Sequence, residues 1–273
     1  MGKKREGIML CYPFEERRFE RWGTWALAQP KLDGYRCRAL LKDTGVELLS
    51  STEEPIVLPH IEEALNSLIF RLTSCGIFEL DGEIYKHGLP FQHIRRKTNS
   101  DRLEYHVFDH VSQMPCCDRL WDLESLDLSE DLPIKIIKSH RVDTVEQIAS
   151  SLAAYYTAGY EGIVIRHPSA MYERKRSTGI MKFKPHQNDV YEVVGFEEEI
   201  SITGQPKGSL GALVCKDDDG ETFSVGTGFT RVDRERLWAE RYSLIGLLVE
   251  IKYQALTERG VPRFGIFLRL WRV

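Results

Sequence analysis

The sequence lacks the features that would place it at once in a fibrous, membrane or metal-binding class. It has no apolar run of membrane-spanning length, no internal repeat and no low-complexity stretch. None of its six cysteines belongs to a Cys-x-x-Cys pair, and no histidines stand at zinc-finger spacing. A structural zinc is therefore not expected, and we interpret the cysteines as free thiols that are buried or incidental.

A net positive charge is also missing, because 37 lysines and arginines face 41 aspartates and glutamates. This balance excludes a generally basic protein that coats nucleic acid. The charge is nevertheless sorted along the chain. Residues 166–184 contain six basic residues and one acid, whereas residues 121–131 contain five acids and no basic residue. The first segment is either one anion-binding face or a solvated surface, and we predict the second to be a long surface loop.

The chain has 273 residues, of which 42% are hydrophobic and 29% charged, as in an ordinary globular protein. This length favours two domains. Helical periodicity predicts one helix from Pro59 and another that starts at a Thr144–Gln147 capping box and stops at Gly159. The basic start lacks the long apolar stretch of a secretory signal.

After residue 188 the pattern changes to short β-rich runs, with one helix predicted over Arg231–Arg241 and capped by Thr230. The five predicted strands are Val190–Phe196, Leu210–Cys215, Glu221–Val225, Leu247–Tyr253 and Phe264–Leu270. Their number and spacing favour a small five-stranded OB-type barrel. The whole chain therefore belongs to the α+β class.

Five short strings carry the residue types that could perform chemistry. They are, in order, KLDGYR (31–36), DGEIY (81–85), YHVFDHV (105–111), EGIVIR (161–166) and MKFKP (181–185). Taken singly, each has a plain structural explanation, such as a hairpin turn at Asp33-Gly34 or core packing of Phe108.

Strand alternation strengthens the second string. Within IFELDGEIY, the side chains of Glu79, Asp81 and Glu83 share one face of a strand. Three carboxylates on one face repel each other unless water, a cation or basic partners surround them. The pattern indicates either a metal or ribose site or a solvated face.

The last two strings place charge at strand ends. Lys182 and Lys184 share one face, and their mutual repulsion favours an anion such as phosphate between them. The alternative is an edge strand that its lysines protect from aggregation. Glu161 begins an apolar strand, either as a metal ligand or simply as a polar residue at a strand end.

Taken together and in this order, the strings resemble the nucleotidyltransferase motifs of ATP-dependent DNA ligases, of the small type found in bacteriophages and large DNA viruses. The resemblance continues through GSLGALV (208–214), FSVGTGFT (223–230) and VPRFGIFLR (261–269), which are similar to the OB domain of those ligases. It implies an adenylation domain of antiparallel sheets with flanking helices at residues 1–187. A small all-β OB-fold barrel then follows at residues 188–273.

The resemblance implies an enzyme that seals 5′-phosphate/3′-hydroxyl nicks in duplex DNA at the expense of ATP. Lys31 matches the nucleophile that attacks the α-phosphate, forms lysyl-AMP and later passes AMP to the DNA. Lys182 and Lys184 match the pair that binds the α-phosphate. We also expect them to help lower the pKa of Lys31, since the attacking amine must be neutral.

Other positions match family residues that bind the nucleotide. Glu83 resembles the ribose-binding carboxylate, Phe108 the ring that stacks on adenine, and Glu161 an acid near a divalent metal. Arg36 resembles an arginine that contacts nucleotide or nick phosphate, and Gln29 stands where the family contacts the base. The expected ion is Mg²⁺, with Glu83 and Glu161 as its carboxylates.

The chain departs from the family pattern in three places. Ser51 stands where the family has an arginine, so a phosphate contact is missing or comes from elsewhere, with Arg38 as the candidate. Only a short polar loop (201–207) occupies the region where some viral ligases carry a long insertion. The ending LRLWRV offers Arg269 and Arg272 without the acid and lysine that often close the last motif.

With no long DNA-encircling insertion or N-terminal DNA-binding domain, we expect salt-sensitive binding to nicked duplex DNA. The predicted DNA contacts are Arg95, Arg96, Lys97, Arg174, Lys175 and Arg176.

Two alternatives remain open at this stage. The first is another lysine nucleotidyltransferase, either an RNA ligase or a GTP-dependent capping guanylyltransferase, since both share the Lys-x-Asp-Gly core. The second is a nucleic-acid binding module that has lost its chemistry. We expect a monomer without a membrane partner in the cytoplasm, the host cytoplasm if a phage encodes it.

Overall fold

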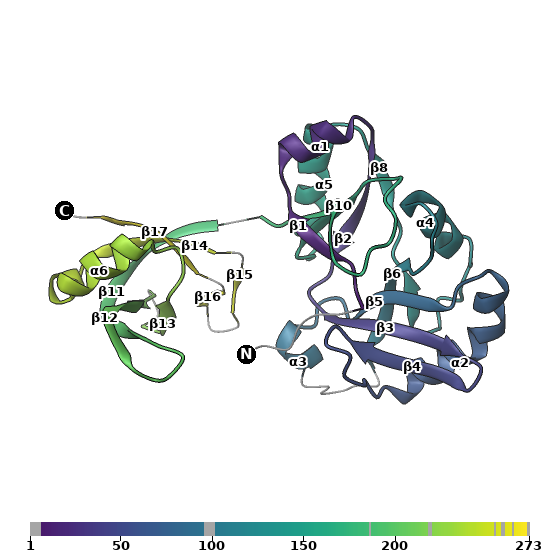
Figure 1. Cartoon of the computed structure of the whole chain (residues 1–273), viewed down its shortest axis with the longest axis horizontal. Helices are drawn as coiled ribbons and strands as arrows, with labels where there is room; N and C mark the ends of the chain where they lie inside the picture. The colour runs from purple at the N-terminus through teal and green to yellow at the C-terminus, as the bar shows by residue number, and fades with distance from the viewer. Residues whose placement is uncertain are drawn as a thin grey trace. The chain divides into compact units, whose positions relative to one another are not determined.

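The computed structural model describes residues 7–95, 102–185, 187–217, 220–253, 255–257, 260–263 and 265–271. The chain divides into two compact units, Met1–Lys184 and Pro185–Val273 (Figure 1). Within the described residues, no helix is long and apolar enough to cross a membrane. The cysteines form no disulfide there, and Cys37, Cys116 and Cys215 are buried, as predicted.

Two five-stranded sheets form the first unit (Figure 1). The first sheet has the order β1-β10-β9-β2-β8. Its strands are β1 (Leu10–Pro13), β2 (Ala26–Lys31), β8 (His140–Val142), β9 (Gly162–Arg166) and β10 (Arg176–Phe183). Helices α1 (Glu16–Trp22) and α5 (Val145–Thr157) contribute Phe19 and Ile148 to its apolar core.

The second sheet has the order β4-β3-β5-β6-β7. Its strands are β3 (Tyr35–Lys42), β4 (Gly45–Ser50), β5 (Glu79–Tyr85), β6 (Glu104–His110) and β7 (Ile134–Ile136). Helices α2 (Pro59–Ser74), α3 (Phe91–Arg95) and α4 (Cys116–Glu124) belong to the same part of the chain. The predicted antiparallel sheets are antiparallel except at two edge pairs, β1 with β10 and β6 with β7, which are parallel.

The helix ends follow the local sequence signals. Proline occupies the first turn of α2, as predicted, and Ile61, Leu65 and Leu72 form its buried face. At the start of α5 the Thr144 side chain accepts the backbone N–H of Gln147. The reciprocal bond of the predicted capping box is not the one formed, since Gln147 accepts the N–H of Asp143 instead.

The prediction of a long surface loop at residues 121–131 is wrong in its first part, because α4 extends through Glu124. The sequence signal was misleading because the acidic residues lie on the outer face of an amphipathic helix. Arg119, Leu120 and Leu123 point inward and are buried.

The second unit contains a five-stranded sheet of order β13-β12-β11-β14-β17. Its strands are β11 (Gln187–Ile200), β12 (Pro206–Lys216), β13 (Thr222–Val225), β14 (Leu248–Tyr253) and β17 (Ile266–Trp271). A two-stranded ladder joins β15 (Ala255–Leu256) to β16 (Pro262–Arg263). In this part of the chain the described ladders do not close a barrel, and one isolated bridge, Thr227 to Ile266, connects the segment after β13 with β17.

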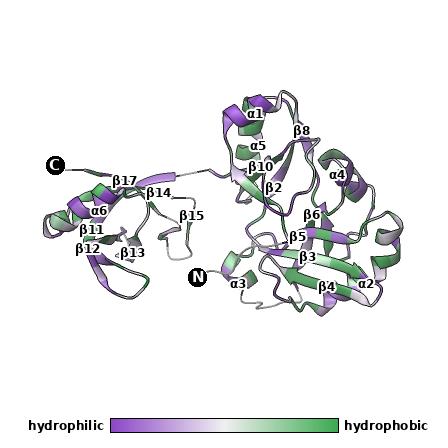
Figure 2. Ribbon diagram, viewed as in Figure 1, coloured by the Kyte–Doolittle hydropathy of each residue, from purple (hydrophilic) through white to green (hydrophobic). Residues whose placement is uncertain are grey.

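Helix α6 (Arg231–Ala239) follows β13 as predicted, and η2 (Arg241–Leu244) comes after it. The helix starts at a complete capping box between Thr230 and Asp233. Figure 2 shows both hydrophobic and hydrophilic residues along α6, and Leu237 contributes to the core of this unit.

Candidate active site

Four of the five strings line one cavity in the first unit, and Ile180, the residue before the fifth string, lines it too. Strands from both sheets contribute its walls: β1, β2, β9 and β10 from the first, and β3, β5 and β6 from the second. The lining residues are Cys11, Gln29, Pro30, Lys31, Leu32, Arg36, Glu83, Phe108, Val164, Arg166 and Ile180. The cavity therefore contains five of the eight predicted nucleotide-site residues.

At one end of this cavity two ammonium groups share a carboxylate. Lys31 ends β2, and its Nζ lies 2.6 Å from Oε2 of Glu161. Lys184 follows β10, and its Nζ pairs with Oε1 of the same carboxylate. The backbone N–H of Glu161 also donates to the carbonyl of Lys31 at 2.9 Å. Burial opposes ionisation of Glu161, but the two lysines outweigh this effect and lower the pKa of its carboxyl.

A glycine makes this close approach possible. A Cβ at Gly162 would collide with the carbonyl oxygen of Phe183 and the Cα of Lys184. Only glycine therefore lets the end of β10 pass so near the start of β9. This steric requirement explains why Glu161 is followed by glycine in the EGIVIR string.

The expectation of a lowered Lys31 pKa is wrong for the protein without nucleotide. Burial alone would lower the pKa, but the charges of Glu161 and Glu83 raise it above the ordinary lysine value. The lowered pKa that was expected for Lys31 is found for Lys182 instead. Burial and the charges of Lys184 and Lys31 lower the pKa of Lys182.

The three carboxylates on β5 have different surroundings. Glu83 lines the cavity, and its burial, which outweighs the attraction of Lys31 and Arg36, raises its pKa to about 7. Asp81 is fully buried and receives two hydrogen bonds from Arg36, 2.7 Å from Nε and 2.5 Å from Nη2. Basic partners thus stabilise Asp81 and leave Glu83 as the member of the row that faces the cavity.

Glu79, the third carboxylate, bridges two arginines. Arg38 Nε donates to its Oε1 at 2.6 Å, and Arg174 pairs with both of its oxygens. Arg38 is 5% exposed and also pairs with Glu53. The guanidinium of Arg38 thus pairs with two carboxylates of the protein itself. This argues against Arg38 as the residue that supplies the phosphate contact missing at Ser51.

Phe108 on β6 is a cavity wall rather than a core residue. The guanidinium of Arg36 lies over its ring, with Cζ 4.5 Å from the ring centroid, and Cζ of Arg166 lies 5.6 Å from the same centroid. Gln29 on β2 is 1% exposed and donates from Nε2 to the carbonyl of Phe108 at 3.3 Å. Its Oε1 accepts from Arg166 Nε at 2.8 Å.

Behind this wall lies a buried charge network that the sequence did not predict. Asp109 is fully buried between Arg119, with Nε 2.8 Å from Oδ1, and Arg166, with Nη1 2.6 Å from Oδ2. Burial would raise the pKa of Asp109, but the two guanidinium groups outweigh it and lower the pKa. Asp109 and Arg166 belong to the YHVFDHV and EGIVIR strings. Arg119 comes from the segment just before the predicted acidic loop.

The residues predicted to contact DNA differ in the partners that their side chains have within the protein. The Lys175 side chain is 70% exposed and pairs with Glu173 at 2.9 Å on the surface. Arg174 is bound to Glu79, and Arg176 donates to the carbonyl of Cys11. The side chain of Arg95, and residues Arg96 and Lys97, lie outside the described residues, as does Arg272.

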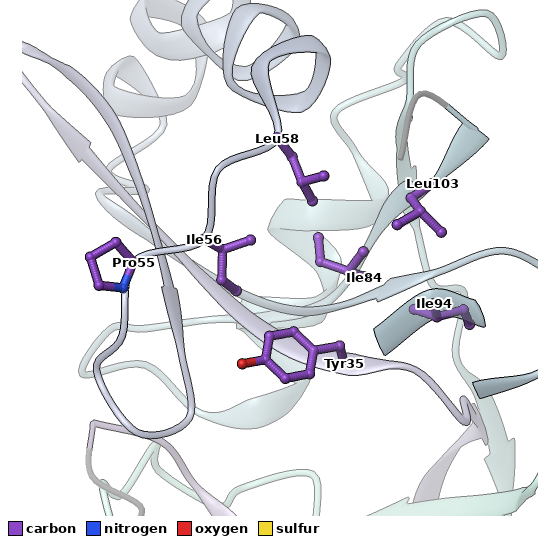
Figure 3. A pocket seen from close by; sticks show the side chains of 7 residues that line it. All are labelled: Tyr35, Pro55, Ile56, Leu58, Ile84, Ile94 and Leu103. Carbon is purple, nitrogen blue, oxygen red and sulfur yellow. The ribbon is translucent and has the colours of Figure 1, made fainter. Parts of the chain in front are cut away.

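A second cavity lies beside β3 and β5, and Figure 3 shows its seven lining side chains. They are Tyr35, Pro55, Ile56, Leu58, Ile84, Ile94 and Leu103, and they include no charged group. Ile84 adjoins Glu83 in sequence but points into this apolar space (Figure 3). This second cavity therefore offers a phosphate no charged partner.

Comparison with known families shows where the chain belongs. Residues 8–184 match the model of the ATP dependent DNA ligase domain, and residues 203–270 match the DNA ligase OB-like domain. The chain belongs to the ATP-dependent DNA ligases. The predicted family, the adenylation domain followed by an OB-like domain, and the enzyme class are thereby confirmed.

Relatives named DNA ligase support the same conclusion. A DNA ligase of Haemophilus influenzae is 27% identical over 278 residues, covering 96% of this chain and 91% of its own length. A DNA ligase of Archaeoglobus fulgidus is 31% identical over 240 residues, which is 78% of this chain but 42% of that protein. The RNA ligase and capping alternatives are not favoured by these relatives.

Solved structures share the fold of this ligase. The structure entitled Pmar-Lig_PreS3 is 25% identical, has a TM-score of 0.82, and is covered over 67% of its length by 96% of this chain. A structure from a structure–function analysis of Lig E DNA ligases is 21% identical with a TM-score of 0.76, and 97% of this chain covers 99% of it.

Proposed function

We propose that Lys31 is the nucleophile of this ATP-dependent ligase. The observation that carries the proposal is the convergence of Lys31, Glu161 and Lys184 at one end of a cavity that also contains Phe108 and Glu83. In this step the Lys31 nitrogen forms a bond to the α-phosphorus of ATP, and the bond to pyrophosphate breaks. The amine loses a proton in the process, because an ammonium has no lone pair for attack.

Glu161 holds the Lys31 amine in place before the reaction and is the nearest acceptor for its proton. Lys182 lies within β10, and Lys184 directly follows the last residue of this strand and pairs with Glu161. We assign them to the α-phosphate oxygens, on which negative charge builds up during attack. A phosphate would give Lys182 an anionic partner, since burial and the neighbouring lysines lower the pKa of its ammonium.

The nucleoside half of ATP fits the rest of the cavity. We assign the adenine to the exposed face of the Phe108 ring and the ribose hydroxyls to Glu83. We assign Gln29 to the base as well. Its amide is fixed by Arg166 and by the Phe108 carbonyl, beside the ring to which we assign the adenine.

The donor set also fits Mg²⁺. Glu83 and Glu161 repel each other electrostatically, which is one reason for the raised pKa of Glu83. The described residues contain no group of three or more acidic, histidine or cysteine side chains that could hold a metal alone. Mg²⁺ is commonly held by one or two carboxylates together with water and substrate phosphates. When bound, it would neutralise charge on the phosphates.

We further propose the remaining steps on nicked DNA. The 5′-phosphate at the nick takes AMP from Lys31, and the 3′-hydroxyl then attacks that phosphate, forms the phosphodiester and releases AMP. Arg36 is assigned to a nucleotide or nick phosphate, and the exposed Lys175 to the DNA backbone. The protein acts as a monomer, with residues 1–187 carrying the adenylation chemistry and residues 188–273 forming the OB domain.

The experiment that tests this proposal uses the purified protein, α-labelled ATP, Mg²⁺ and a singly nicked duplex with a 5′-phosphate. We expect label on the protein in the absence of DNA, and conversion to the full-length strand in its presence. With Lys31→Ala, labelling is lost. Labelling of the Lys31→Ala protein at the wild-type level would contradict the assignment of the nucleophile.

A further inference from the structure

Tyr172 joins the loop between β9 and β10 to Asp81 of β5, which pairs with the cavity residue Arg36. Its ring is 8% exposed, and its hydroxyl donates to Oδ2 of Asp81 at 2.5 Å. The same hydroxyl oxygen accepts the backbone N–H of Met9 at 3.3 Å. Both hydrogen-bonding functions of the hydroxyl are thus used inside the protein.

The partner of Tyr172 is the carboxylate that holds Arg36. Oδ1 of Asp81 accepts from Nε of Arg36, and Oδ2 accepts from Nη2. Nη2 also donates to the carbonyl of Met9 at 3.3 Å, so Met9 and Asp81 each contact both Arg36 and Tyr172. The four groups form one connected hydrogen-bond network.

This network fixes the guanidinium of Arg36 in one plane. The bidentate pair with Asp81 sets its edge, and the Phe108 ring, 4.5 Å from Cζ, supports its face. Within the described part of the chain, Nη1 of Arg36 makes no hydrogen bond. Nη1 is therefore the nitrogen of the guanidinium that can donate to a phosphate.

We propose that Tyr172 is a positioning residue for Arg36. By fixing Oδ2 of Asp81, its hydroxyl sets the plane of the guanidinium and the direction of Nη1. A carboxylate that could rotate would let the guanidinium turn with it, and phosphate binding depends on that direction. This inference rests on the proposed function, because it assumes that Arg36 contacts a phosphate of the nucleotide or the nick.

The loop does not depend on this hydroxyl for its attachment. Arg119 donates to the carbonyl of Ala170 at 3.0 Å, and Arg174 binds Glu79 through both carboxylate oxygens. The ring of Tyr172 also packs with Met9 and Ile180. Replacing tyrosine by phenylalanine keeps these contacts and removes one oxygen atom, so the loop is expected to remain in place.

The test compares Tyr172→Phe with Tyr253→Phe. Tyr253 is also buried and donates its hydroxyl to an aspartate carboxylate, Oδ2 of Asp189, at 3.0 Å, but it belongs to the second unit. Single-turnover rates are measured for self-adenylylation and for sealing of a pre-adenylylated nick. We expect Tyr172→Phe to lower at least one of these rates by about tenfold, the effect of losing one hydrogen bond to a charged group. Tyr253→Phe stays within about twofold of wild type in the same rates.

A double-mutant cycle separates positioning from a general structural effect. In an Arg36→Lys background, which lacks the planar guanidinium, Tyr172→Phe is expected to cause no further loss. A full tenfold loss in that background, or wild-type rates for Tyr172→Phe alone, would overturn the inference. The Lys31→Ala labelling experiment is independent of both outcomes, so failure of the proposed function is recognised separately.

Discussion

Lys31 and Glu161 form an ion pair of 2.6 Å between the last residue of β2 and the residue before β9. The pair keeps the Lys31 amine charged, because the charge of Glu161 raises the pKa of Lys31 despite its burial. With Lys31 as the proposed nucleophile, its amine is held in place in the ATP-free protein but carries a proton that prevents attack. Loss of the proton belongs to the reaction itself.

The first prediction concerns the identity of the nucleophile. Lys31→Arg keeps the positive charge and the pairing with Glu161, but a guanidinium does not deprotonate near neutral pH. We expect this variant to lose self-adenylylation by at least about 10³-fold, as Lys31→Ala does. Lys31→Ala should still seal a nick that already carries AMP. Gel-based labelling with α-labelled ATP measures the first step, and a pre-adenylylated nick measures the last.

The second prediction concerns the pH dependence of adenylylation. Glu161→Gln removes a charge that raises the pKa of Lys31, so the neutral amine becomes available at lower pH. The rising limb of the adenylylation rate should shift to lower pH, while the maximum rate falls because the amine is less well placed. Single-turnover labelling from pH 6 to pH 10 gives both quantities. An unshifted limb would show that Glu161 does not control the Lys31 proton.

The third prediction links Glu83 to stability. The pKa of Glu83 is raised to about 7 from an ordinary 4.5, mainly by burial. Between these pH values the folded protein holds a proton that the unfolded chain has released, so this group lowers stability as pH rises. Glu83→Gln removes the effect and should gain about 2 kcal/mol over wild type between pH 5 and pH 8.

Urea denaturation of the ATP-free protein at the two pH values measures this difference. Glu20→Gln, on the exposed surface of α1, is the matched control and should show no such gain. Equal stability differences for Glu83→Gln at pH 5 and pH 8 would contradict the prediction.

The fourth prediction concerns the network behind Phe108. Asp109→Asn leaves Arg119 and Arg166 buried without their shared carboxylate. Removal of one partner from a buried ion pair costs about 3–5 kcal/mol. Asp143→Asn breaks an exposed pair with Arg141 and should cost less than about 1 kcal/mol. The free energies of unfolding from denaturant titrations distinguish the two, and similar values for both variants would contradict the prediction.

The sequence predicted most of what depends on local pattern. The alternation of Met181, Lys182, Phe183 and Lys184 places Met181 in the core and both lysines toward the site. The start of α2 at Pro59 and the capping of α6 at Thr230 follow equally local rules.

Contacts between distant segments were not predictable in this way. Whether Lys31 is neutral or charged depends on Glu161, 130 positions away, and on its distance in the fold. Arg119 reaches Asp109 only because α4 turns an acidic stretch outward and its arginine inward. Arg38 looked available for phosphate because nothing in the sequence places it between Glu79 and Glu53.

The fifth prediction separates the basic residues of the 174–176 segment. Lys175 is exposed, and its side chain forms a surface pair with Glu173, whose contribution to stability is small. If Lys175 contacts a DNA phosphate, Lys175→Ala should weaken binding to a nicked duplex and reduce the slope of log affinity against log salt by about 0.9. Lys42→Ala, on the hairpin of β3 and β4, is the matched control and should leave the slope unchanged. Equal slopes for Lys175→Ala and wild type would remove Lys175 from the DNA interface, since each released counterion contributes to that slope whatever the base sequence.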